Sequence, residues 1–119
     1  MGILKDTPAI RRAGGVLALL VMGAIAVLSL LPPGDLPPVE GSDKVKHFIA
    51  YAVLAAPMTI WAGPGRTLRA VILTLGFGAL MEVAQALSPT GREASLLDEL
   101  ANALGAALGT GLALIVRKR

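Results

Sequence analysis

The sequence predicts an all-α integral membrane protein, a four-helix up-down bundle with both termini in the cytoplasm. Composition is the first reason: 55% of the 119 residues are hydrophobic and only 16% are charged, and the mean hydropathy is +0.71. These values are outside the usual range for a soluble domain. The second reason is that four apolar stretches approach the roughly 20 residues needed to cross a bilayer core. The third is the placement of the basic residues, which indicates how these stretches are oriented.

The first apolar stretch covers about residues 15–31 and follows a basic segment. Ala24 and Ala26 loosely match the small-residue pattern of a signal-peptidase site, so the stretch is either a cleaved signal peptide or an anchor. Because apolar residues continue to Leu31, we interpret it as a signal anchor. Residues 31–40 contain four prolines and are predicted to form an extended link across the outer surface, since proline removes a backbone donor and restrains its predecessor.

The remaining stretches cover about residues 47–62, 68–87 and 97–116. Pro57 is expected to kink the second, and the Gly-Pro-Gly-Arg sequence at 63–66 predicts a tight turn before the third. Because the connections are short, consecutive helices should be antiparallel neighbours. Residues 1–119 therefore form a single membrane domain.

Basic residues indicate the orientation of the helices. Eight of them flank the helix ends that share one side, and three lie on the other side. The positive-inside rule places the larger group in the cytoplasm. We interpret the pI of about 9.8 as a topology signal rather than a sign of nucleic-acid binding, and the absence of cysteine excludes disulfides and thiol catalysis. The cytoplasmic group is Lys5, Arg11, Arg12, Arg66, Arg69, Arg117, Lys118 and Arg119, and the outer group is Lys44, Lys46 and Arg92.

Polar residues gather at the predicted outer ends of three helices. Ionisable groups at membrane depth are costly, so such a cluster is a candidate site. Helical spacing of three or four residues places its members in pairs on shared faces, and Glu82 lies roughly 7 Å below the outer boundary at 1.5 Å per residue. We predict a shallow ligand-binding pocket in the outer leaflet, formed by Asp43, Lys44, His47, Tyr51, Glu82, Gln85, Arg92, Asp98 and Asn102.

Structural roles are the alternative for most of these residues. Ser95 and Asp98 have the spacing of a capping box, and Ser42 or Asp43 could be a helix N-cap. Tyr51 and Trp61 are typical interfacial anchors. Glu82 is harder to explain in this way, because a carboxylate inside the membrane needs a partner, for which His47 and Arg92 are the candidates.

The fourth helix contains a Gly-x-x-x-Gly spacing, formed by Gly105 and Gly109. Small residues at this spacing allow close backbone approach to a neighbouring helix. We expect this packing to hold Asn102 against the helix that carries Glu82, although Asn102 could also simply bridge helices.

Three motifs, in this order, resemble the VanZ-like family of small bacterial membrane proteins. They are DKVKHFIAY at 43–51, MEVAQ at 81–85 and GREASLLDELANALG at 91–105, and the resemblance covers about residues 41–112. The ordered set is far more specific than any single motif. The family's motif positions carry over without departure as Asp43, Lys44, His47, Tyr51, Glu82, Gln85, Arg92, Ser95, Asp98, Asn102 and Gly105.

The resemblance implies a multi-pass protein of the bacterial cytoplasmic membrane, in a family named for a teicoplanin-resistance accessory protein. Teicoplanin-type antibiotics act on lipid-linked peptidoglycan precursors at the outer membrane surface. A pocket there would bind an envelope lipid or precursor head group, with Arg92 and Lys44 pairing with phosphate or carboxylate.

Ion conduction is not expected, because the inner halves of the helices at 71–75 and 108–116 offer only Thr74 and Thr110 as polar residues.

Two other function classes remain open. In a membrane-embedded hydrolase or transferase acting on an envelope lipid, His47 or Glu82 would be the general base, Asp98 would orient the histidine, and Arg92 or Lys44 would stabilise an oxyanion. His47, Glu82 and Asp98 could also bind a metal, but a single histidine is a weak signal, so we predict no metal and no cofactor. In the third class the protein is non-catalytic and acts through contacts with other membrane proteins.

Overall fold

A computed structural model describes residues 2–31, 43–88 and 96–117. Within these ranges the chain forms four α-helices: α1 (Pro8–Leu30), α2 (Asp43–Ala62), α3 (Thr67–Leu87) and α4 (Leu96–Val116). The described residues include no strand, and β-type pairing among them is limited to an isolated bridge between Leu4 and Arg117. The predicted all-α class is therefore confirmed.

Two helices begin earlier than the apolar stretches indicated. Thr7 is the N-cap of α1, its side chain accepting a hydrogen bond of 3.1 Å from the amide of Ile10, and Pro8 occupies the first turn. Both are favourable helix-start signals. The α2 helix starts at Asp43. Its first turn is polar, so the apolar pattern alone did not include it. At 23 residues, α1 is about 34 Å long and exceeds the hydrocarbon core of a bilayer.

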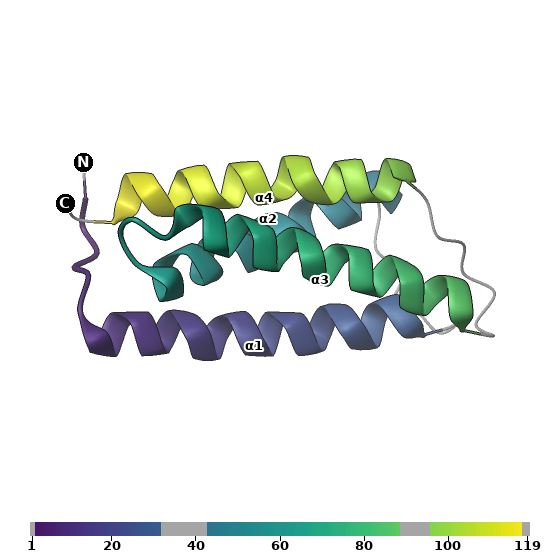
Figure 1. The fold of residues 1–119 in the computed structure, drawn as a ribbon, viewed down its shortest axis with the longest axis horizontal. Helices are drawn as coiled ribbons and strands as arrows, with labels where there is room; N and C mark the ends of the chain where they lie inside the picture. The colour runs from purple at the N-terminus through teal and green to yellow at the C-terminus, as the bar shows by residue number, and fades with distance from the viewer. Residues whose placement is uncertain (1, 32–42, 89–95, 118–119) are drawn as a thin grey trace.

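Consecutive helices run in opposite directions, and the two ends of the chain lie at the same end of the bundle (Figure 1). The amides of Ile3 and Leu4 both donate to the carbonyl of Val116 at 2.8 Å, which ties the segment before α1 to the end of α4. The up-down arrangement predicted from the short connections is therefore confirmed.

The turn between α2 and α3 requires glycine. Gly63 and Gly65 have φ angles of +86° and +77°, which are left-handed values that glycine adopts without steric cost. The Gly63 amide donates to the carbonyl of Thr59 and the Arg66 amide donates to the carbonyl of Gly63, both at 3.2 Å. This is the tight turn predicted from the Gly-Pro-Gly-Arg sequence.

Many small residues are buried inside the bundle, and many large apolar residues lie exposed on its outer surface. Leu19, Leu20 and Leu96 are 68%, 67% and 90% exposed, as expected where lipid rather than water surrounds the helices. Small and polar side chains at helix interfaces are typical of membrane packing, and all four helices are long and apolar enough to cross a membrane. The buried positions include Gly14, Ala18, Ala55, Thr59, Ala70, Thr74, Gly78, Ala101, Gly105, Ala106, Gly109 and Ala113.

The closest helix contact joins α2 and α4. A Cβ atom at Gly105 would collide with the carbonyl oxygen of Phe48, and one at Gly109 would collide with that of Ala52. The predicted close approach is thus confirmed, but the two glycines face α2 rather than the helix that carries Glu82. Asn102 nevertheless reaches α3, because a Cβ at Gly78 would lie 3.0 Å from Asn102 Nδ2.

Candidate functional site

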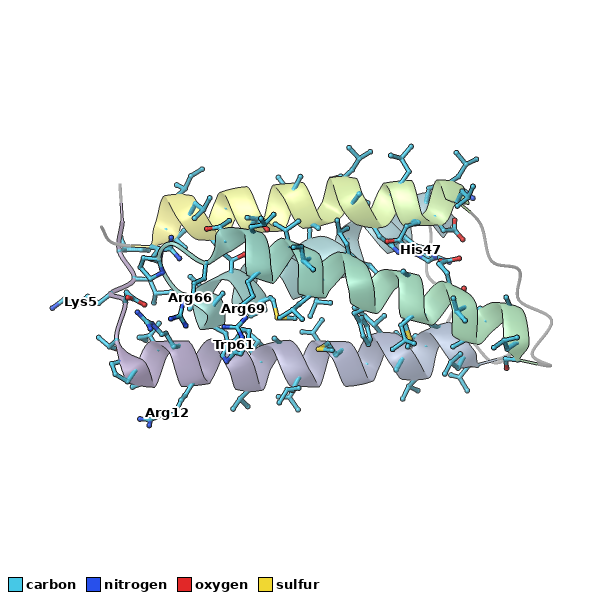
Figure 2. All side chains as sticks on the ribbon, viewed as in Figure 1. Lys5, Arg12, His47, Trp61, Arg66 and Arg69 are labelled. Carbon is cyan, nitrogen blue, oxygen red and sulfur yellow. The ribbon has the colours of Figure 1, made fainter. Side chains whose placement is uncertain are left out.

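Three helices each contribute one ionisable side chain to a common cluster. His47 of α2, Glu82 of α3 and Asp98 of α4 each offer a nitrogen or oxygen atom, and these atoms all lie within 4.8 Å of one another. His47 lies toward the end of the bundle opposite Lys5, Arg12 and Arg66 (Figure 2). The convergence predicted from the helix ends is therefore seen for these three residues. Arg92 and the side chain of Asp43, predicted to join them, lie outside the described residues.

Asp98 links α4 to α2. Its side chain is almost completely buried, with Oδ1 at 3.0 Å from Lys44 Nζ and Oδ2 at 3.7 Å from His47 Nε2. The lysine contact lacks hydrogen-bond alignment, so it is an ion pair rather than a directed bond. A buried carboxylate requires such pairing to offset its desolvation. The capping-box interpretation is not tested, since Ser95 lies outside the described residues.

A buried amide fixes the orientation of the histidine. Asn102 is 0% exposed; its Oδ1 lies 2.9 Å from His47 Nδ1, and its Nδ2 donates to Glu99 Oε2 at 3.4 Å. Because the Glu99 carboxylate can only accept, the amide oxygen must face the imidazole, and Nδ1 therefore carries a hydrogen. The second ring nitrogen, Nε2, faces the Asp98 carboxylate.

Tyr51 supports the imidazole ring. It is 2% exposed, its ring stacks on His47 with centroids 6.4 Å apart and an interplanar angle of 6°, and it also packs against Phe77. The expected role of Tyr51 as an interfacial anchor is therefore wrong, because the ring is inside the bundle. Trp61 differs, since it is partly exposed and the Arg69 guanidinium lies 5.8 Å from its ring centre.

Gln85 takes part in another contact. It is buried, and its Nε2 donates to the carbonyl oxygen of Ser29 at 2.8 Å. This bond joins α3 to α1 and directs the amide nitrogen away from the cluster. The assignment of Gln85 as a ligand-binding residue stays a prediction.

Two features of the site were missed from the sequence. Glu99 orients Asn102, and its three-residue spacing from Asn102 was the signal that could have identified it. An open groove of about 480 Å³ runs between α2 and α4 beside the cluster. No sequence signal marks it, because its apolar walls resemble ordinary lipid-facing positions. The groove is lined by Lys44, Val45, Phe48, Leu97, Leu100, Ala101 and Leu104.

The opposite end of the bundle carries a different set of charges. Arg11 donates from Nε and Nη2 to the two carboxylate oxygens of Asp6, at 2.7 and 2.6 Å. This hydrogen bonding holds the pKa of Asp6 below its usual range. Lys5, Arg12, Arg66 and Arg69 lie at or towards this end (Figure 2), so the two ends differ in chemical character.

No family model, curated protein or solved structure matches this chain. A lysine whose side chain is half exposed and whose residue also lines an apolar groove suits an anionic amphiphile, whereas one imidazole and two carboxylates from three helices suit a proton or a cation.

Proposed function

We propose that this protein is a VanZ-like, multi-pass protein of the bacterial cytoplasmic membrane that binds an anionic envelope lipid or a lipid-linked peptidoglycan precursor at its outer face. The observation that carries this proposal is that Lys44 takes part in both the polar cluster and the apolar groove. Its ammonium group contacts buried Asp98, and the same residue lines the apolar groove between α2 and α4.

Charge distribution supports the proposed orientation. Lys5, Arg12 and Arg66 lie at the end of the bundle that holds both chain ends, and His47 lies toward the other end (Figures 1 and 2). Positive residues beside membrane helices favour the cytoplasmic side. The termini would then be cytoplasmic and the cluster would face outward, where lipid-linked precursors are used.

The groove and the lysine would bind different parts of one molecule. An acyl or prenyl chain would lie along Phe48, Leu100 and Leu104. It would replace the chain of a bulk lipid there, an exchange with little change in free energy because both are hydrocarbon. The phosphate of its head group would approach Lys44 from the exposed side, since 48% of that side chain is exposed whereas Asp98 is buried. Arg92, just before α4 in the sequence, would supply a second positive charge and a bidentate contact.

The resemblance to the VanZ-like family adds an expected phenotype. A protein that binds lipid-linked precursors at the outer surface would compete with teicoplanin-type drugs for them. Expression should therefore raise tolerance to teicoplanin, and the Arg92→Gln variant should lose this effect.

Lipid binding can be measured by native mass spectrometry of the purified protein. Phosphatidylglycerol should bind more tightly than phosphatidylcholine, and Lys44→Gln and Arg92→Gln should each weaken its binding by about 10- to 100-fold, since a charge-assisted hydrogen bond contributes about 1.5–3 kcal/mol. Lys46→Gln is the matched control, because this exposed lysine does not line the groove. Inorganic phosphate added alone should not displace the lipid, because it cannot fill the groove.

The outcomes separate the function classes. If the Lys44 and Arg92 variants keep both wild-type lipid binding and wild-type thermal stability, the head-group proposal fails and a structural or interaction role replaces it. If the bound lipid changes in mass during incubation, the protein is instead a hydrolase or transferase acting on that lipid.

A further inference from the structure

The cluster has the ligand types and nearly the spacing of a metal site. His47 Nε2 and Asp98 Oδ2 lie 3.7 Å apart, and the ligand atoms of His47, Glu82 and Asp98 all lie within 4.8 Å of one another. In a tetrahedral zinc site with bonds of about 2.0 Å, neighbouring ligand atoms are about 3.3 Å apart. Modest side-chain rotations would therefore complete a three-residue ligand set.

The surroundings of His47 also fit a metal ligand. Its Nδ1–H donates to Asn102 Oδ1, and Asn102 is held in turn by Glu99. Metal-binding histidines almost always donate their other ring N–H in this way, which fixes the tautomer and the ring plane. With Nδ1–H donated to Asn102, a neutral imidazole presents its Nε2 lone pair to the Asp98 carboxylate 3.7 Å away, and a proton or a cation between these two acceptors would relieve their repulsion.

We propose that His47, Glu82 and Asp98 bind a divalent transition-metal ion, for which Zn²⁺ fits best. Imidazole with carboxylates favours zinc and its neighbours, whereas Mg²⁺ and Ca²⁺ prefer oxygen ligands alone. A divalent ion also offsets the charge of the two ligand carboxylates in a region of low dielectric constant. Lys44 contacts Oδ1 of Asp98, which leaves Oδ2 for the ion.

This inference goes beyond head-group binding and does not depend on it. A single histidine gave little reason to expect a metal from the sequence, but the fold brings its partners from positions 35 and 51 residues further along the chain, as their numbers show. Three protein ligands also leave a coordination position open.

Zinc binding to the full-length protein can be measured by calorimetry in a neutral detergent without lipid, after treatment with a chelator. We expect one Zn²⁺ per chain, and His47→Gln, Glu82→Gln and Asp98→Asn should each weaken the affinity by about 100-fold or more, because removing a ligand exceeds the 10–100-fold effect of a supporting residue. Asp6→Asn, a carboxylate at the other end of the bundle, is the matched control and should bind zinc like the wild type. Mg²⁺ should not compete at equal concentration.

A second measurement does not depend on the variants folding. X-ray absorption of the zinc-loaded wild type should show one imidazole and oxygen ligands. Substitution of zinc by cobalt should give the visible absorption spectrum of a Co²⁺ ion with a low coordination number. A zinc shell without imidazole, or equal zinc affinity in the wild type and in folded His47→Gln, overturns the proposal. Because no lipid is present, zinc binding can fail while phosphatidylglycerol binding persists, and the reverse.

Discussion

Asn102 contributes more to the site than its size indicates. It is completely buried and bonds His47 and Glu99 together, so replacing it with an apolar residue leaves the His47 Nδ1–H without an acceptor inside the bundle. Asn102→Leu should therefore lower the free energy of unfolding by about 1–3 kcal/mol, measured by reversible unfolding in mixed micelles.

Thr74→Val is the control for Asn102→Leu. The Thr74 hydroxyl is also completely buried, but it donates to the carbonyl of Ala70 at 2.8 Å, an acceptor that the helix already uses. Its loss should cost less than about 1 kcal/mol. Equal effects of the two substitutions would show that the Asn102 network does not hold the imidazole.

Asp6 gives a pH-dependent prediction. Hydrogen bonds from Arg11 lower the pKa of Asp6 in the folded protein, so the stabilisation is present above the unfolded pKa of about 3.9 and is lost as the pH falls through the lowered folded value. The wild type should exceed Asp6→Asn in melting temperature at pH 6, and the difference should vanish at low pH. A constant difference across that range would mean that Asp6 acts through packing rather than charge.

At the residue scale, the sequence identified the ionisable groups that converge but not all of the contacts made around them. His47, Glu82 and Asp98 could be predicted to meet because charged groups in a membrane must avoid lipid. The contact of Gln85 with the Ser29 carbonyl could not be predicted, since it depends on how α1 is rotated against α3. The buried position of Tyr51 depends in the same way on the packing of α2 against α3, because the ring lies beside Phe77.

Among the helices, the α2–α4 contact should be the most sensitive to an added methyl group. At Gly105 the new Cβ would meet the Phe48 carbonyl, a backbone atom that cannot rotate away, so the helices must separate. Gly105→Ala should cost about 1–3 kcal/mol and weaken binding at the nearby cluster.

Gly111 is the matched control for Gly105, because it belongs to the same helix and a Cβ there meets nothing within 4 Å. Gly111→Ala should be neutral or should stabilise the helix by up to about 1 kcal/mol. Destabilisation by Gly111→Ala, or tolerance of Gly105→Ala in the same unfolding assay, would contradict the close α2–α4 contact.

Helix ends were predictable only where lipid-facing residues continue to the end. The predicted C-terminal ends agree with the structure to within one residue, because apolar residues run to the last turn. The starts of α1 and α2 were placed too late, since Thr7 capping and the polar first turn of α2 extend the helices beyond their apolar parts. The spacing of Gly105 and Gly109 marked a close-packed face, but spacing alone does not identify the helix that packs on it.

For the whole molecule, the testable property is orientation. Both chain ends lie at the end of the bundle where Lys5 and Arg66 also lie (Figures 1 and 2), and the positive-inside rule predicts that this end is cytoplasmic. A reporter active only in the cytoplasm should give signal when fused after Arg119 and none when inserted near Pro37. The reverse pattern would place the cluster on the cytoplasmic side and end the head-group proposal in its present form.

The number of helices and their alternating direction followed from hydropathy and short connections, which are properties of the whole chain. The groove beside the cluster did not, because it arises from the packing of α2 on α4. The membership of Arg92 in the site remains a prediction, since this residue lies outside the described residues.

The groove between α2 and α4 is open on the side of the bundle, and exposed Leu97, Leu100 and Leu104 form part of its wall. A molecule anchored in the bilayer could therefore enter sideways by two-dimensional diffusion, without first leaving the membrane. Occupancy would then follow the mole fraction of that molecule among the surrounding lipids rather than its bulk concentration. Dilution with neutral lipid should empty the groove even when the total amount of protein and ligand is unchanged.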